Sequence, residues 1–195
     1  MIETELKSSV PDLDAACTAV RHAGARLVFE GELEDRRYDT PDRQLLARDE
    51  VLRTRVYRVG ARAHAQLDWK GPTSLAGGYK QREERSTVVS DPEQLAVILE
   101  QLGFVVSMAI DRYIWQYEID GATVRFERYP RMDDLVEVEG PPDAIERAIE
   151  HTGLPRAGFT GDRLSVFAAA YAARTGSTAV LSRAGHGIER GLANV

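Results

Sequence analysis

Polar and apolar residues alternate along most of this chain, as they do in β-strands that have one polar and one apolar face. In residues 2–7 the charged side chains, Glu3, Glu5 and Lys7, share one face. The same period of two predicts later strands at residues 27–37, 51–59, 63–70, 79–89, 111–119, 122–128 and 135–139. Asp120-Gly121, between two of these segments, is a two-residue hairpin signal. The pattern therefore predicts about eight strands, mostly joined by hairpins.

Apolar residues at helical spacing interrupt the strands and predict helices. These helices are expected at residues 12–24, 91–103, 143–149 and 162–174. A short helical turn is expected at Leu45 and Leu46. The residues after Gly176 are rich in glycine, serine and alanine. We therefore expect one domain, residues 1–175, followed by a loosely packed tail, residues 176–195.

The unusual feature of the predicted strands is the amount of charge on their polar face. Eight strands can close into a barrel, which leaves no unpaired edge. The apolar face would then pack under helices outside the barrel, through Ile2, Leu6, Leu52, Val56, Leu67, Trp69, Val124, Phe126, Val136 and Val138. The charged face would point inward, with Glu3, Glu5, Lys7, Arg53, Arg55, Lys70, Lys80, Arg82, Glu84, Arg112, Arg125, Glu127, Glu137 and Glu139. We therefore predict an α+β fold: an eight-stranded antiparallel closed barrel, or tunnel, with a charged interior and amphipathic helices packed outside. The alternative is an open antiparallel sheet with its charged face in solvent.

Composition narrows the classes of protein to which this chain can belong. With 195 residues, of which 43% are hydrophobic, it is long enough for one globular domain with a core. Its net charge of -6 disfavours non-specific nucleic-acid binding. No apolar run reaches the roughly 20 residues that span a bilayer, and a single cysteine, Cys17, permits no internal disulfide. We expect a cytoplasmic protein with no nucleic-acid partner and no membrane association.

A tunnel lined with so many charges must hold water and a highly charged ligand, because an unpaired buried ion is costly. Arginine and lysine suit the oxygens of a polyphosphate, and glutamate oxygens suit Mg²⁺ or Mn²⁺. The histidines are scattered, so no zinc site is expected. A Walker-type phosphate loop is also missing from the sequence. The residues thus permit a metal-assisted reaction on a polyphosphate.

Short motifs along the strands point to a known family. The first strand carries Glu3-Thr4-Glu5-Leu6-Lys7, and the later motifs are Tyr38-Asp39-Thr40-Pro41-Asp42, Leu52-Arg53-Thr54-Arg55, Leu67-Asp68-Trp69-Lys70-Gly71-Pro72, Arg82-Glu83-Glu84 and Val136-Glu137-Val138-Glu139. The first resembles the E-x-E-x-K signature of the CYTH superfamily, and the others resemble its later motifs in the same order. This superfamily, also called the triphosphate tunnel metalloenzymes, unites class IV adenylate cyclases and thiamine triphosphatases. The resemblance runs from about residue 2 to 174.

The resemblance implies an eight-stranded tunnel that binds a triphosphate together with a divalent metal. By position, the phosphates would be held by Lys7, Arg53, Arg55, Lys70, Arg82 and Arg112, and the inward residues Lys80 and Arg125 complete the expected basic set. The metal and its water would be held or oriented by Glu3, Glu5, Glu84, Glu137 and Glu139. Relatives usually carry a second basic residue two positions after Arg112. That position is Ile114 here, and Arg125 on the next strand could fill the gap.

The leading expectation is a phosphohydrolase that depends on Mg²⁺ or Mn²⁺ and acts on a triphosphate. The substrate would be inorganic tripolyphosphate, a nucleoside triphosphate or thiamine triphosphate. One alternative is a class IV adenylate cyclase, which converts ATP to cyclic AMP and pyrophosphate. Another is a polyphosphate-binding module without turnover, which the Ile114 substitution keeps open. The glutamate that acts as base, the organic part of the substrate and the existence of a homodimer stay open.

Overall fold

The computed structural model describes residues 2–183. Its strands are β1 (Ile2–Ser9), β2 (Arg26–Asp39), β3 (Val51–Val59), β4 (Arg62–Lys70), β5 (Ser74–Ala76), β6 (Tyr79–Val89), β7 (Val105–Ile119), β8 (Ala122–Arg128) and β9 (Leu135–Glu139). Its helices are α1 (Leu13–His22), α2 (Gln44–Ala47), α3 (Pro92–Gln101), α4 (Pro142–Thr152) and α5 (Leu164–Thr175), with a 3₁₀ turn at Arg156–Gly158.

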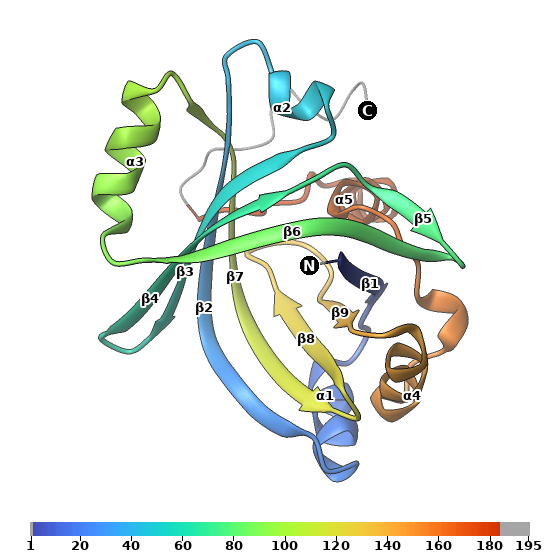
Figure 1. The fold of residues 1–195 in the computed structure, drawn as a ribbon. Helices are drawn as coiled ribbons and strands as arrows, with labels where there is room; N and C mark the ends of the chain where they lie inside the picture. The colour runs from blue at the N-terminus through green and yellow to red at the C-terminus, as the bar shows by residue number, and fades with distance from the viewer. Residues whose placement is uncertain (1, 184–195) are drawn as a thin grey trace.

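The strands form a closed antiparallel barrel (Figure 1). Their order around the barrel is β1-β9-β8-β7-β2-β3-β4-β6, and β6 pairs back onto β1, which closes the circle. This confirms the eight-stranded barrel that the alternating pattern predicts. β5 is an additional short strand paired with β6. It was not expected, because three exposed residues carry no detectable period.

The long strand β7 starts earlier than expected, at Val105 instead of Asp111. The segment before Asp111 is an almost unbroken apolar run, so it has no period of two that would identify a strand. The structure pairs it with β2, which is almost equally long. At the other end of β7, Asp120 and Gly121 have φ angles of 52° and 82° and form the predicted hairpin turn into β8.

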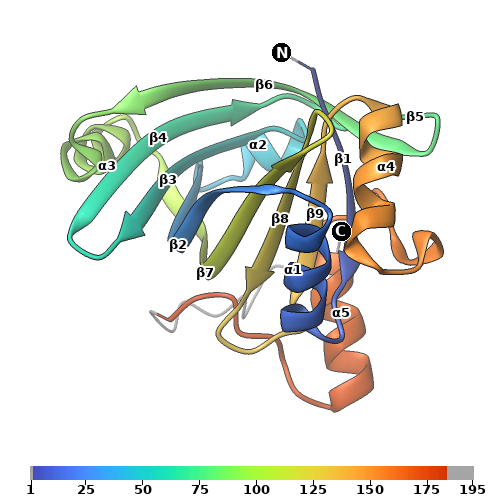
Figure 2. The ribbon, with the colours of Figure 1, turned by 90° about the horizontal axis from the view of Figure 1, so that it is seen from below.

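The main hydrophobic core lies between one side of the barrel and two helices. α1 begins after Asp12, whose side chain accepts a hydrogen bond from the backbone N of Ala15 at 3.0 Å. α1 packs against α4, and α4 packs against β1, β8 and β9 (Figure 2). The buried residues of this core include Leu6, Val20, Val124, Phe126, Val136, Val138, Ile145 and Ile149.

Helices cover only part of the barrel, which corrects the expectation for the remaining apolar positions. The expected residues on β1, β8 and β9 are buried under helices, except for Ile2, which is 63% exposed. Those on β3 and β4 are only half-buried; they are Leu52, Val56, Leu67 and Trp69. The reason is that α1 and α4 pack on each other and therefore lie on the same side of the barrel. An amphipathic sequence predicts that a helix packs, but not which strands it covers.

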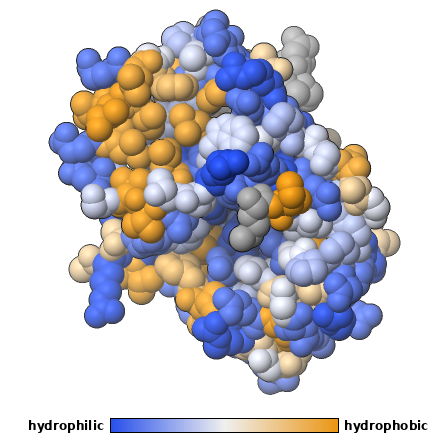
Figure 3. Space-filling model, in the orientation of Figure 1, coloured by the Kyte–Doolittle hydropathy of each residue, from blue (hydrophilic) through white to orange (hydrophobic). Residues whose placement is uncertain are grey.

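Helix α3 lies in the connection between β6 and β7 and buries only Leu99 of its own residues. Ile98 and Leu102, which the spacing also assigns to its buried stripe, are 53% and 69% exposed, and Val97 is exposed as well. Figure 3 shows apolar surface in this region of the molecule. Among the helices within residues 2–183, none combines the length and the apolar character needed to cross a lipid bilayer.

The beginning of the expected tail is packed against the barrel. Val180 forms an isolated β-bridge with Arg131. The backbone O of Leu181 accepts a hydrogen bond from Asp111 N at 2.7 Å, and Ser182 Oγ donates to the Asp111 carboxylate at 2.7 Å. Leu181 and Ser182 are buried. The expected loose packing therefore does not hold for residues 179–183, which these contacts and their burial fix to the barrel; residues 184–195 lie outside the described residues.

Candidate functional site: a charged tunnel

The polar faces of the barrel strands meet in the interior, as the alternating pattern predicts. Register brings them together: Glu5 lies opposite Lys80 on β6 and Glu139 on β9, and Glu137 lies opposite Lys7. Of the expected site residues, those that are buried are Glu5, Lys7, Arg53, Arg55, Lys70, Arg112, Arg125 and Glu137. Those that are half-buried are Glu3, Lys80, Arg82, Glu84 and Glu139. Charges this well shielded exclude the open sheet with a solvated charged face.

Two arginines of β3 are held by carboxylates that are completely buried. Arg53 donates to Asp68 at 3.1 Å and to Asp35 at 3.2 Å, and Arg55 donates to the same Asp68 oxygen at 2.5 Å. Both guanidinium groups also face Glu84, at 3.7 and 3.4 Å. Burial alone would lower the pKa of Arg53, but Asp35, Asp68 and Glu84 raise it above its ordinary value. Both arginines are therefore oriented cations before any ligand binds.

Every lysine of the chain points into the tunnel, and two of them flank Glu5. Lys7 Nζ lies 2.9 Å from Glu5 and also pairs with Glu137, while Lys80 pairs with Glu5. Burial, together with the positive charge of Lys7, lowers the pKa of Lys80 to about 8. Burial would raise the pKa of Glu5, but the lysines outweigh it and hold that pKa well below the usual range. Glu5 is therefore ionised at neutral pH.

The third lysine, Lys70, is shared by two carboxylates. It pairs with Glu3 and lies 3.1 Å from Glu84. Burial opposes ionisation of Glu3, but a hydrogen bond from Glu84 and the charge of Lys70 lower its pKa below the ordinary value. Burial and the neighbouring Glu3 raise the pKa of Glu84. Of this pair, Glu84 therefore holds the proton more tightly.

Three carboxylates of the tunnel lie close enough to bind one metal ion. Oxygens of Glu3, Glu5 and Glu139 all lie within 4.8 Å of one another. Burial raises the pKa of Glu139, and the repulsion from Glu3 and Glu5 adds to this effect, although Arg125 opposes it. A hard divalent cation would relieve this repulsion, and three carboxylate oxygens are the donor set that Mg²⁺ and Mn²⁺ prefer. These three residues therefore fit the expected metal.

The other two glutamates of the expected metal set lie outside this group of three. Glu84 faces Lys70 and the two arginines of β3, as described above. Glu137 pairs with Lys7 and with Arg125. Any part that Glu84 and Glu137 take in orienting metal or water stays a prediction.

Ile114 on β7 occupies the position, two residues after Arg112, where relatives usually carry a second basic residue. Ile114 is completely buried and lies in register with Glu127. Arg125, the next inward residue of β8, is buried and donates to Glu127 at 3.0 Å and to Glu139 at 3.3 Å. Arg112 lies 3.2 Å from Glu127. Arg125 therefore supplies a cation beside Ile114, and its replacement of the missing phosphate contact stays a prediction.

One expected phosphate ligand is engaged elsewhere. Arg82 donates to the backbone oxygen of Gly71 at 2.6 Å and to that of Asp49 at 2.5 Å. These two bonds connect β6 to the loop before β3, which contains Asp49, and to the loop after β4, which contains Gly71. The geometry therefore assigns Arg82 a structural contact, and its role toward phosphate stays a prediction.

Sequence reasoning missed three inward residues, namely Asp35, Arg37 and Asp68. Asp68 and Asp35 hold the arginines of β3, as described above. The side-chain Nε of Arg37 and Oδ1 of Asp35 are buried without a hydrogen-bond partner in the part of the chain that the structure describes. Burial lowers the pKa of Arg37, and Asp35 only partly offsets this. Asp35 and Arg37 share one face of β2 with Phe29 and Leu33. The alternation of polar and apolar residues therefore predicts that this face is apolar.

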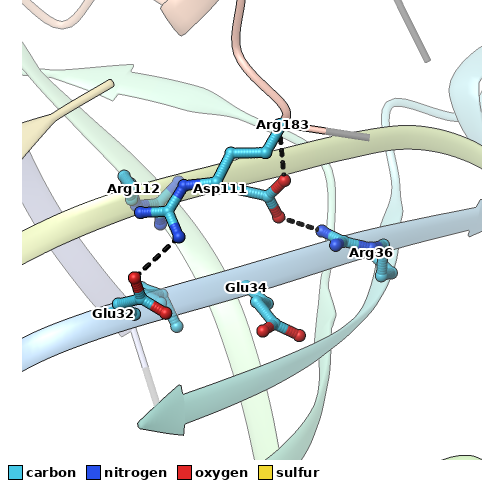
Figure 4. Close-up of a pocket in the computed structure, with 7 residues that line it drawn as sticks. Glu32, Glu34, Arg36, Asp111, Arg112 and Arg183 are labelled. Atoms are coloured by element: carbon cyan, nitrogen blue, oxygen red, sulfur yellow. Dashed lines mark hydrogen bonds and ion pairs between the residues drawn. The ribbon is translucent and has the colours of Figure 1, made fainter. Parts of the chain in front are cut away.

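A hollow outside the tunnel does not qualify as a candidate site. It has a volume of about 320 Å³ and lies between β2, β7 and Arg183 (Figure 4). Arg183 reaches across it to Glu32 at 2.6 Å, and Arg36 pairs with Asp111 at 2.6 Å. These ion pairs already satisfy the charged groups that line it.

Comparison with known proteins agrees with the motifs and the barrel. The model of the CYTH domain family matches residues 1–140. A search of curated proteins gave no match.

Solved structures share the fold of this chain. The PH1819 protein of Pyrococcus horikoshii aligns with a TM-score of 0.69 and 23% identity, over 83% of this chain and 94% of that one. A Vibrio parahaemolyticus protein, provisionally described as an adenylate cyclase, aligns with a TM-score of 0.73 and 18% identity, over 86% and 97%. The Hippeastrum protein HpAC1, an adenylyl cyclase candidate described with a dominant triphosphatase activity, aligns with a TM-score of 0.61 and 18% identity, over 93% and 98%. At these identities the likeness concerns the fold.

Proposed function

The chain belongs to the CYTH domain family, and on this premise we propose that it is a divalent-metal-dependent phosphohydrolase acting on a triphosphate bound in the tunnel. The triphosphatase activity described for the Hippeastrum protein supports hydrolysis as the reaction. A chain of three phosphates suits this tunnel as a substrate, because the cations are spread over several strands, among them β1, β3, β4 and β6.

The observation that carries the proposal is the group formed by Glu3, Glu5 and Glu139, with oxygens within 4.8 Å of one another. Lys7, Lys70 and Lys80 surround this group in the same interior. Hard oxygen donors next to several cations suit a metal–polyphosphate complex, in which the ion and the basic residues share the negative charge of the phosphates.

Glu3, Glu5 and Glu139 would hold Mg²⁺ or Mn²⁺. When bound, such an ion polarises a phosphoryl oxygen and offsets its charge. Arg53 and Arg55 would bind the nonbridging oxygens, and because Asp68 already orients both guanidinium groups, little reorganisation is needed on binding. The buried walls limit the access of bulk water, which strengthens these contacts.

The proposal is tested by incubating the protein with tripolyphosphate or with ATP, each with Mg²⁺ or Mn²⁺, and identifying the products. Release of orthophosphate supports hydrolysis. Cyclic AMP and pyrophosphate from ATP would instead make the protein a class IV adenylate cyclase, and tight binding without any product would make it a binding module.

Glu5→Gln tests the metal site. The change removes one ionised oxygen ligand, so we expect metal-dependent turnover to be lost and Mn²⁺ affinity, measured by electron paramagnetic resonance, to fall by at least roughly 10-fold. Glu118→Gln is the matched control, because Glu118 lies near the end of β7, pairs with Arg26 and has its side chain 52% exposed. Unchanged Mn²⁺ binding in Glu5→Gln would remove Glu5 from the site.

A further inference from the structure

A second cavity, of about 500 Å³, opens at one end of the barrel and has a different lining from the charged tunnel. We call it the aromatic mouth, and it is lined chiefly by Phe29, Tyr57, Val59, His64, Gln66 and Gln116. Arg62 is the one arginine, lysine, aspartate or glutamate among its lining residues. The proposed phosphohydrolase chemistry makes no use of this cavity.

The aromatic mouth continues the tunnel along the same faces of the strands. Tyr57 follows Arg55 on the inward face of β3, two residues further along. Gln66 lies in register with Arg55, and Gln116 lies in register with Arg125. Burial lowers the pKa of Arg125, but Glu139, Glu127 and then Tyr57 outweigh it, which places Tyr57 within electrostatic reach of that arginine. The aromatic mouth therefore adjoins the charged tunnel, so one ligand can place an organic group in the mouth and its phosphates in the tunnel.

The rings of the aromatic mouth form an adaptable stacking surface. Phe29 meets Tyr57 edge to face, with centroids 5.3 Å apart and planes at 79°. Tyr57 and His64 are tilted by 31°, with centroids 5.8 Å apart. The guanidinium carbon of Arg55 lies 5.8 Å from the centre of the Tyr57 ring, so Tyr57 is held from the tunnel side. Phe29 and Tyr57 are half-buried and His64 is exposed at the rim, so an incoming flat group can reach them.

The polar groups of the mouth are available to a ligand. Neither Gln66 nor Gln116 forms a side-chain hydrogen bond to another residue within 2–183, although both are half-buried. An amide offers a donor and an acceptor side by side. Apolar rings with a few convergent amides are the usual lining of a site for a flat heteroaromatic molecule.

We propose that the aromatic mouth binds a planar heteroaromatic group carried by the triphosphate whose phosphates lie in the tunnel. Phe29, Tyr57 and His64 stack against the ring, and Gln66 and Gln116 bond its edge. This inference rests on the proposed function and deepens it, because it makes an organic triphosphate the preferred substrate over inorganic tripolyphosphate.

The test compares ligands that share the phosphates and differ in the ring. Affinities for ATP, thiamine triphosphate, ribose 5-triphosphate and tripolyphosphate are measured by calorimetry in the presence of a chelator, which prevents metal-dependent turnover. Stacking of one base changes affinity by roughly 5- to 150-fold, so we expect at least one ring-bearing ligand to bind tighter than ribose 5-triphosphate by a factor in that range. A gain for ATP identifies a purine base as the group, and a gain for thiamine triphosphate alone identifies a cationic ring system.

Tyr57→Leu removes the central ring, and the expected result is that the ratio of ATP or thiamine triphosphate affinity to ribose 5-triphosphate affinity falls toward one. His64→Ala, at an exposed position that does not endanger folding, should lower the same ratio in part. Tyr113→Leu is the matched control, because Tyr113 is half-buried on the outer face of β7 and packs on Trp115; it should leave the ratio unchanged.

The outcomes separate this inference from the function on which it rests. Tripolyphosphate binding with no gain for either ring-bearing ligand would overturn the inference and leave the proposed function standing. A gain that survives both Tyr57→Leu and His64→Ala would also overturn it, since the ring would then bind elsewhere. If no ligand binds in the presence of the chelator, the same ratios are taken from KM values with Mg²⁺. If no ligand binds or is turned over there either, the proposed function fails and the inference fails with it.

Discussion

Replacing Arg53 by methionine tests whether the charged faces of the strands point inward. Methionine keeps much of the length of the side chain but removes its charge and its donors. In the native protein Arg53 bonds Asp35 at 3.2 Å and Asp68 at 3.1 Å, and neither of these carboxylates is exposed. After the change Asp68 keeps Arg55 and Ser86, whereas Asp35 loses its nearest cation.

The expected cost follows from the burial of these groups. Removing one partner of a buried ion pair typically costs about 3–5 kcal/mol, because the other charge stays buried. For a domain of this size, each kcal/mol lowers the melting temperature by about 2–4 °C, so the expected fall is about 6–20 °C. Arg58→Met is the control on the same strand. Arg58 lies on the outer face with its side chain 44% exposed and pairs with Glu34 at 2.9 Å, and loss of such a surface pair costs about 0–1 kcal/mol.

Urea unfolding followed by circular dichroism gives both free energies of unfolding under identical conditions. The same samples with tripolyphosphate show whether Arg53→Met also loses the stabilisation that a bound ligand gives. An Arg53→Met protein as stable as Arg58→Met would contradict the reasoning, because Asp35 and Asp68 would then not depend on Arg53.

Three further predictions concern groups outside this pair. Arg37→Met should weaken tripolyphosphate binding by about 1.5–3 kcal/mol in calorimetry with little loss of stability, since its buried Nε has no partner in the described chain; an unchanged dissociation constant would exclude Arg37 from the site. Burial would raise the pKa of Asp111, but hydrogen bonds from Ser182 and Arg36 lower it. Its ionised form therefore stabilises the fold above the ordinary carboxyl pKa, and this contribution is lost as pH falls through the lowered value. Asp111→Asn should accordingly cost about 1–3 kcal/mol in urea unfolding at pH 7 and less at pH 3; an equal cost at both would refute the assignment. Burial raises the pKa of Cys17 to about 11, so its thiol should react with Ellman's reagent at pH 8 far more slowly in the native protein than in urea; prompt native reaction would show that Cys17 is accessible.

The lining of the tunnel could be predicted because each strand carries its charges at every second position. Lys7, Arg53 and Arg125 are in phase with acidic neighbours two residues away on the same strands or opposite them, so one face of the strands carries most of the charge. The sequence left bulk solvent as the alternative place for that face, and the pairing of β6 with β1 decides for the interior of a closed barrel. The closing of the sheet followed from the same pattern, since eight strands with a common polar face suffice for a barrel.

Other features depend on long-range packing that a local period does not encode. Asp35 and Arg37 could not be assigned, because their face of β2 also carries the apolar Leu33. The exposure of Trp69 and Leu67 depends on where α1 and α4 pack, and that is decided by contacts between the two helices. The edge-to-face contact of Phe29 with Tyr57 joins strands β2 and β3, although Tyr57 lies opposite Leu33 in the register, so no local period predicts this contact.

The first strand has a consequence for how the protein acquires its site. β1 pairs with β6 along one edge and with β9, the last strand, along the other. Glu3 and Glu5 therefore become neighbours of Glu139 only when that final seam forms, and contacts between such distant parts of a chain form slowly. An ion that needs all three carboxylates stabilises the closed barrel, and it does not stabilise folding intermediates in which the barrel is still open. Divalent cations should consequently slow unfolding without accelerating the early steps of folding, so the same three side chains would also govern how long a finished molecule survives.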